Sequence, residues 1–150
     1  MLMTPHFLTG MAIATVVPEV WPASVMAVMS HLILDAIPHK DSIGEIKLNK
    51  PNITIRSIDV FIMVLFFWYL TKDRGDWLYL LLIGFVAVLP DWLAFPYLIW
   101  PKLYDYPVIK DLHQWHSKVI QHKNRYVNWF WGLLPQIIVV GAMIWFIVRT

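Results

Sequence analysis

The sequence contains no cysteine, and it has few charged residues for a chain of 150. The lack of thiols excludes disulfides and thiolate metal sites, so any metal would have to be bound by histidine nitrogens and carboxylate oxygens. Charged residues make up 15% of the chain, whereas soluble domains have about 25%. The GxSxG, Walker and CxxC motifs are also missing, so no serine nucleophile, nucleotide site or redox centre is indicated.

Apolar residues dominate what is present. The chain is 59% hydrophobic, with nine tryptophans, six tyrosines and eight phenylalanines, and its mean hydropathy is +0.58. A single integral membrane domain fits this composition better than a soluble one. Residues 1–9 contain no lysine or arginine, so we expect this segment to be retained rather than cleaved as a signal peptide. The net charge of +2 is too small to indicate nucleic acid binding.

Five apolar stretches predict the helices. They run from about Thr4 to Val17, Pro22 to Ile37, Ile55 to Thr71, Asp76 to Trp100 and Tyr126 to Val148. A spanning helix needs about 20 apolar residues, so the last two stretches qualify, whereas the first two are short and could form a hairpin or a re-entrant pair. The predicted fold is an all-α, integral membrane helical bundle of four to five transmembrane helices, covering residues 1–150.

Basic residues are distributed unevenly under this topology. If all five stretches cross the membrane, the side that holds the N-terminus (side A) carries nine lysines and arginines, and the opposite side (side B) carries Lys72, Arg74 and Arg149. Positive residues are enriched in cytoplasmic loops. We therefore expect an inner-membrane protein whose long basic loops, 38–54 and 101–125, face the cytoplasm.

The segment SHLILD at 30–35 places a histidine and a carboxylate inside an apolar stretch. His31 and Asp35 are four residues apart, so they share one face of a helix. Asp35 would lie in the last helical turn, where the helix dipole disfavours a carboxylate unless a cation is near. His39 and Asp41 follow at once and can fold back toward the same place.

A second polar segment, DLHQWHSK at 111–118, contains His113 and His116, which would be neighbours on a helix. Asp91, in LPDW, and His6 are the further candidate ligands on side A. Such a set suits zinc, with manganese or iron as alternatives, and more than four candidates would allow two metals.

Structural roles for the same residues remain open. His31 and Asp35 could form a hydrogen-bonded pair between helices, and His113 and His116 could lie on an amphipathic interfacial helix. Asp91 could accept backbone hydrogen bonds. Asp59 is expected to pair with Arg56 rather than to bind metal.

Four short motifs carry a resemblance to a known family. The segments PHFLTG at 5–10, SHLILD at 30–35, LPDW at 89–92 and WHSK at 115–118 resemble motifs of the bacterial inner-membrane metal-dependent hydrolase family, which is distantly similar to zinc-dependent phospholipase C. The order of the motifs differs, and Trp92 follows the PD pair where that family continues to an Asp and a His. The resemblance implies a helical membrane metalloenzyme with six candidate ligands: His6, His31, Asp35, Asp91, His113 and His116.

The sequence therefore predicts a metal-dependent hydrolase that acts near the cytoplasmic face on a phospholipid or another amphipathic phosphoester. Asp41 or His39 would transfer the proton. The alternatives are a carrier or channel for divalent metals or protons, which would need polar groups continuing toward side B, and a non-enzymatic membrane scaffold. The expected partners are membrane lipid and a small amphipathic substrate.

Overall fold

The structure, a computed structural model, describes residues 1–41, 50–99, 102, 106–115 and 127–150, without the side chains of 93–99, 109, 112 and 113. This part of the chain is helical and contains no strand. The helices are α1 (Met3–Val16), α2 (Val20–Ala36), α3 (Lys50–Thr71), α4 (Trp77–Ile99), the short α5 (Pro107–Trp115) and α6 (Trp129–Arg149). The all-α prediction is thus confirmed, and the five predicted stretches correspond to the five long helices.

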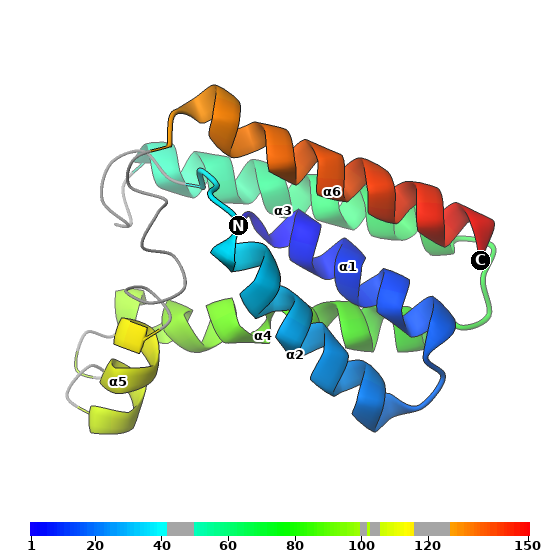
Figure 1. Ribbon diagram of the computed structural model, residues 1–150, viewed down its shortest axis with the longest axis horizontal. Helices are drawn as coiled ribbons and strands as arrows, with labels where there is room; N and C mark the ends of the chain where they lie inside the picture. Colours follow the sequence, from blue (N-terminus) through cyan, green and yellow to red (C-terminus); the bar gives the residue numbers. More distant parts are fainter. Residues whose placement is uncertain (42–49, 100–101, 103–105, 116–126) are drawn as a thin grey trace.

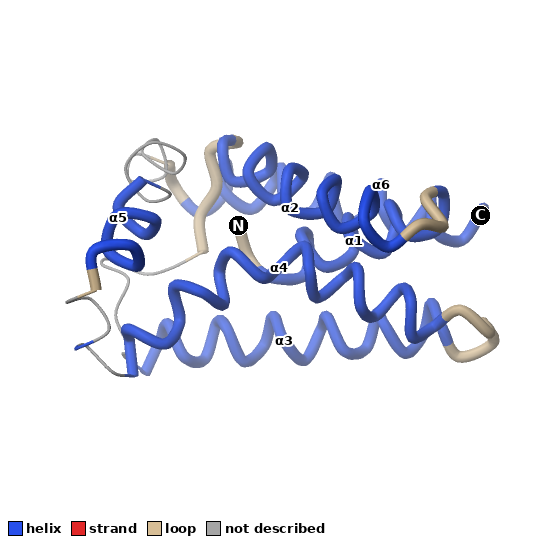
Figure 2. Tube along the Cα trace, turned by 90° about the horizontal axis from the view of Figure 1, so that it is seen from below, coloured by secondary structure: helices blue, strands red, loops and turns tan. Residues whose placement is uncertain are grey.

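The long helices alternate in direction along the chain (Figure 1). The N-terminus, the end of α2, the starts of α3 and α6 and the end of α4 gather at one end of the bundle, which corresponds to side A. The turn before α2, the turn between α3 and α4, and the C-terminus lie at the other end. Helix α5 lies beside the end of α4 at side A, as both views agree (Figure 2).

Prolines mark the boundaries of α2. The helix begins at Val20, and Pro22 falls in its first turn, where the amide that proline lacks would have no intrahelical partner. Pro38 comes two residues after the last helical residue, Ala36. Because proline cannot continue a helix, α2 ends immediately after the segment that carries His31 and Asp35.

Helix α1 is the centre of the bundle and packs against α2, α3, α4 and α6. Its crossing with α4 is close because glycines meet there. A methyl group built at Gly10 would lie 2.6 Å from the carbonyl oxygen of Ile83 and 2.8 Å from Cβ of Ala87. The core around this crossing is apolar and includes Phe7, Met11 and Ile83, each at most 1% exposed.

The outer surface of the bundle is also apolar. Large hydrophobic side chains are exposed on α3 (Phe61, Trp68) and on α6 (Phe130, Ile137, Trp145). Within the described residues, α3 and α6 are the helices long and apolar enough to cross a membrane, and α2 and Trp77–Trp92 of α4 are shorter apolar helices. Only 11% of the apolar window of α3 and 17% of that of α6 are buried, which differs from the buried core helix of a soluble protein.

The hairpin of α1 and α2 is shorter than the helices around it. At 1.5 Å per residue, the 14 residues of α1 extend about 21 Å, whereas the 22 residues of α3 extend about 33 Å. The start of α1 is hydrogen-bonded to Asp59 of α3 and Gln136 of α6. These residues lie about 10–14 Å inward from the side-A ends of their helices. The side-A ends of α1 and α2 therefore lie inside the bundle.

Candidate metal centre

A cluster of histidines and carboxylates occupies the side-A ends of α1 and α2. His6 comes from the first turn of α1, His31 and Asp35 from the second half of α2, and His39 from the segment that follows α2. All four side chains are fully buried. Asp91 of α4 joins them with 27% of its side chain exposed. The structure thus brings together five of the residues that the sequence singled out.

His31 is held in one orientation by the backbone of α4. Its Nδ1 lies 2.8 Å from the carbonyl oxygen of Ala87, and because a carbonyl only accepts, Nδ1 carries a proton. Its Nε2 lies 3.3 Å from Oδ2 of Asp35 and 3.7 Å from Oδ1 of Asp91. An imidazole nitrogen that faces two carboxylates is placed to share a metal cation with them.

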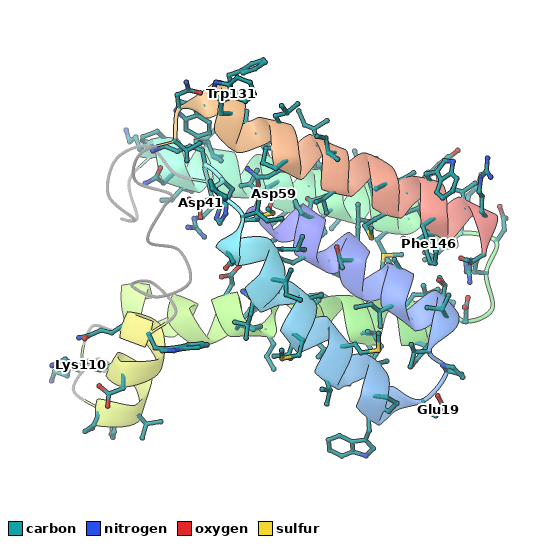
Figure 3. The ribbon with its side chains drawn as sticks, viewed as in Figure 1. Glu19, Asp41, Asp59, Lys110, Trp131 and Phe146 are labelled. Atoms are coloured by element: carbon teal, nitrogen blue, oxygen red, sulfur yellow. The ribbon has the colours of Figure 1, made fainter. Side chains whose placement is uncertain are left out.

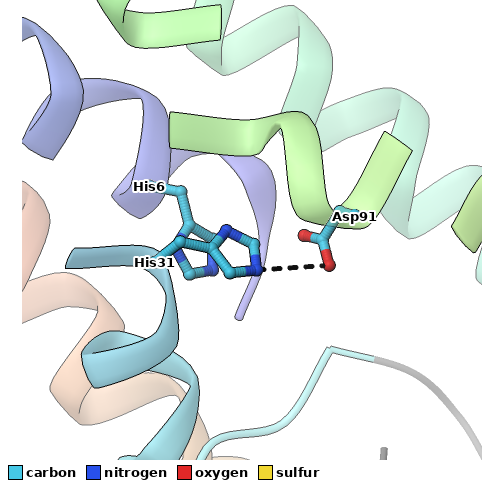
Figure 4. Close-up of side chains that lie close together, drawn as sticks. All are labelled: His6, His31 and Asp91. Carbon is cyan, nitrogen blue, oxygen red and sulfur yellow. Dashed lines mark ion pairs between the residues drawn. The ribbon is translucent and has the colours of Figure 1, made fainter. Parts of the chain in front are cut away.

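His6 stacks on His31, with ring centroids 4.0 Å apart and an interplanar angle of 23° (Figure 4). Its Nε2 lies 3.1 Å from Oδ1 of Asp35. Its Nδ1 is buried and has no hydrogen-bond partner among the described residues. Metal-binding histidines usually donate the other ring N–H to a carboxylate or a carbonyl, and His31 has such a partner in the carbonyl oxygen of Ala87.

His39 repeats the arrangement of His31. Its Nδ1 lies 2.8 Å from the carbonyl oxygen of Ile37, and its Nε2 lies 3.8 Å from Oδ1 of Asp35. Burial, followed by the nearby N-terminal ammonium, lowers the pKa of His39 to about 4. The side chain is therefore neutral at pH 7 and can accept a proton.

Asp35 is the hub of the cluster, since it faces His6, His31 and His39. The α-ammonium group of Met1 also contacts its Oδ1. A carboxylate in the last turn of a helix is disfavoured by the helix dipole. A positive charge beside it offsets this unfavourable interaction. The sequence predicted that a cation would be needed here, and in the structure the ammonium group supplies the positive charge.

The donor set fits a divalent transition metal. His6, His31 and Asp91 can each offer one ligand atom, and these atoms all lie within 4.8 Å of one another. Ligand atoms 2.0–2.2 Å from a tetrahedral zinc are about 3.3–3.5 Å apart. The distances of 3.1, 3.3 and 3.7 Å that join Asp35 and Asp91 to the two imidazoles bracket this spacing. Two imidazole nitrogens and two carboxylates also satisfy the preference of zinc for such ligands.

The other predicted site residues are Asp41, His113 and His116, and the structure describes them only in part. Asp41 is half-buried at the same end of the bundle as Asp59, whereas Glu19 lies at the opposite end (Figure 3). His113 belongs to α5, but its side chain lies outside the described part of the structure, and His116 lies outside the described residues. Their predicted roles as ligands stay predictions.

Asp59 has a different role from the one the sequence indicated. Its carboxylate accepts hydrogen bonds from the backbone amides of Met3 and Thr4 and from the Thr4 hydroxyl, at 2.6–3.3 Å. It therefore caps α1 from α3, and within the described chain it does not pair with Arg56. The first amides of a helix have no intrahelical partners, so a buried helix start requires such a neighbour.

Gln136 was not identified from the sequence. It accepts a hydrogen bond from the amide of Leu2 and donates to the carbonyl oxygen of Lys40. The available signal was a lone amide in the apolar run LLPQII, because a polar group at that depth requires buried partners.

No protein-family model matches the chain, and neither a curated protein nor a solved structure matches it.

Proposed function

We propose that this protein is an integral membrane metalloprotein that hydrolyses a phosphoester. A divalent transition metal, with zinc as the first candidate, would bind at the side-A ends of α1 and α2. The observation that carries the proposal is the group of two stacked, buried imidazoles, the buried carboxylate of Asp35 and the partly exposed carboxylate of Asp91. A buried set of ionisable groups at helix ends inside a bundle is costly unless the groups are paired or coordinate a metal.

Insertion in the membrane is supported by the outer surface. Apolar side chains, including Phe61, Trp68, Ile137 and Trp145, are exposed on α3 and α6, the two helices long and apolar enough to cross a membrane among the described residues. An apolar exterior of this extent is unfavourable in water and favourable in lipid. We assign side A to the cytoplasm from the excess of lysine and arginine in the segments that the sequence assigns to that side.

Hydrolysis is supported by the uneven exposure of the cluster. Asp91 is partly exposed, whereas His6, His31, Asp35 and His39 are fully buried. A catalytic metal site keeps one coordination position open, and the Asp91 side is where a water molecule and a substrate can approach. A bound metal would lower the pKa of that water to near 7 and polarise a phosphoryl oxygen.

The cluster residues would have two roles, metal binding and proton transfer. His6, His31 and Asp91, with Asp35 as an alternative ligand, would hold the metal and leave one coordination position open. The neutral imidazole of His39 would accept the proton, with Asp41 as the other candidate. The site lies about 10–14 Å inward from the side-A ends of α3 and α6, so a phosphoester with an apolar part that enters the membrane, such as a phospholipid, would suit it. The basic loops would attract anionic lipid.

The alternative of a carrier is disfavoured by the polarity of the bundle interior. The buried residues between the cluster and side B are mostly apolar, and they include Met11, Leu80 and Ile147. Of the buried polar residues in the described part of the chain, Thr71 is the one that lies toward side B. A pathway for ions would need polar groups through this half.

The test is elemental analysis of the protein purified in detergent without chelator, followed by assay of a fluorogenic phospholipid with added zinc or manganese. We expect about one or two metal ions per chain and metal-dependent release of the fluorophore. Asp91→Asn should reduce hydrolysis by at least tenfold. Metal content at background that does not rise on addition of either metal would contradict the metalloprotein, and metal without hydrolysis would contradict the hydrolase.

A further inference from the structure

Helix α6 supplies no histidine or carboxylate to the cluster among the described residues, yet it contacts both of the chain segments that lead to the ligands. Gly132 and Gln136 make these contacts. They are four residues apart, so they lie on the same face of α6. Both are buried, and Gln136 is 3% exposed.

The side-chain amide of Gln136 joins the two segments directly. Its Oε1 accepts from the amide of Leu2 at 2.9 Å, and its Nε2 donates to the carbonyl oxygens of Lys40 and Gly132 at 2.8 Å each. One acceptor and two donors are thus all used. Leu2 precedes His6 by about one helical turn, and Lys40 follows His39 directly.

Gly132 allows the backbone after His39 to approach α6. The amide of Lys40 donates to the carbonyl oxygen of Gly132 at 3.2 Å. A methyl group built at Gly132 would lie 2.5 Å from Cβ and 2.7 Å from the backbone nitrogen of Lys40. Any side chain at this position must therefore push the segment with His39 away, whereas Gly141, on the same helix, has open space around it.

We propose that Gly132 and Gln136 are positioning residues with two effects. They hold His39 close to Asp35, and they fix how far the start of α1 lies inside the bundle. The proposal rests on the metal-binding function proposed above. His39 Nε2 lies 3.8 Å from Oδ1 of Asp35, and metal sites tolerate displacements of only about 0.5 Å. Loss of such outer contacts typically weakens metal binding about 10–100-fold.

The experiment uses Co²⁺ as the probe, because its visible absorption reports ligand geometry, on the full chain in detergent. Gly132→Ala displaces Lys40 sterically, Gln136→Met removes the hydrogen bonds at similar volume, and Gly141→Ala is the matched control in the same helix. We expect both test variants to bind Co²⁺ about 10–100-fold more weakly in competition with a chelator. Their visible spectra should be altered, and the control should match the wild type.

Each other outcome counts against a defined claim. If both variants bind Co²⁺ as the wild type does, with an unchanged spectrum, the positioning role is wrong and the metal site stands. If the variants lower the melting temperature in chelator but leave the spectrum of the Co²⁺-bound protein unchanged, the contacts are structural only. If the wild type binds no Co²⁺, the proposed function fails and the positioning role fails with it.

Discussion

His31 uses its two ring nitrogens for different contacts, and a substitution can separate them. The amide nitrogen of asparagine can take the place of Nδ1 and keep the hydrogen bond to Ala87, but asparagine has no atom in place of Nε2. We therefore expect His31→Asn to lose most of the bound metal while its melting temperature in chelator stays close to that of the wild type. Elemental analysis and a melting curve of the same preparation measure the two effects.

The control for this prediction is His122→Ala, which should keep its metal, because His122 is the one histidine of the sequence that is neither a candidate ligand nor a candidate proton acceptor. A purely structural role for His31 predicts the reverse pattern. His31→Asn would then lower the melting temperature in chelator, since Asp35 would lose a partner, and the wild type would hold no metal to lose.

The lowered pKa of His39 makes stability depend on pH in a defined direction. The folded chain holds His39 neutral down to about pH 4, whereas the unfolded chain takes up a proton near pH 6.5. Stability is therefore fully present above pH 6.5 and falls as the pH decreases toward 4. At pH 5.5 the loss should be on the order of 1 kcal/mol.

The matching measurement compares wild type and His39→Gln in chelator at pH 7.5 and 5.5. Glutamine does not titrate, so the melting temperature of the variant should fall less between pH 7.5 and pH 5.5 than that of the wild type. Equal losses in the two proteins would show that His39 is protonated in the folded state at pH 5.5.

At the scale of the elements, the crossing of α1 and α4 depends on Gly10. A methyl group there would meet the backbone of Ile83 at 2.6 Å, and backbone cannot yield as a side chain can. Overpacking of this kind typically costs about 1–3 kcal/mol, so Gly10→Ala should lower the melting temperature clearly. Because α1 carries His6, the variant should also bind metal more weakly.

Gly141→Ala is again the reference, since its surroundings are open. Alanine is favoured over glycine in a helix by about 0.5–1 kcal/mol, so this variant should melt at or above the wild-type temperature. A Gly10→Ala protein as stable as Gly141→Ala would mean that α1 and α4 are less closely packed than described.

The lengths and ends of the helices followed largely from the sequence. The apolar stretches gave both ends of α2 within two residues and those of α4 and α6 within three, whereas α3 begins at Lys50, five residues before the predicted start. The depth of α1 and α2 in the bundle could not be predicted, because it depends on contacts between residues far apart in the chain. Asp59 and Gln136 show this, since their partners Thr4 and Leu2 are more than fifty residues away.

The same reasoning applies to the candidate site. The four-residue spacing of His31 and Asp35 placed both on one face, and their common end of the bundle with His6 followed from the alternation of the helices. The outer contacts could not be predicted, because a backbone carbonyl such as that of Ala87 has no signature in the sequence. The role of Asp59 was misassigned for a related reason, since Arg56 was the nearest candidate in the sequence but the start of α1 is the partner in space.

At the scale of the whole molecule, the grouping of helix ends predicts where each loop can be labelled. The chain has no native cysteine, so a cysteine placed at Lys47 or Asn124 is a unique site. We expect both to be protected from an impermeant thiol reagent in intact cells and to react after the membrane is opened. A cysteine at Asp73, on the turn at side B, should react in intact cells.

Reaction at Lys47 or Asn124 in intact cells would overturn the cytoplasmic assignment of side A. If Lys47 and Asn124 reacted from opposite sides, the alternation of the helices itself would be wrong, because the starts of α3 and α6, which follow these two positions in the chain, lie at the same end of the bundle.

The short hairpin of α1 and α2 has a consequence for biogenesis. His6, His31 and Asp35 leave the ribosome early, whereas the groups that fix the ends of this hairpin come from Asp59, then from α4, and last from Gly132 and Gln136 of α6. A nascent chain that has not yet inserted α6 would hold His6, His31, Asp35 and Asp91 but not the geometry that binds a metal. Loading with metal would therefore be the final step of assembly, after the last helix has entered the membrane.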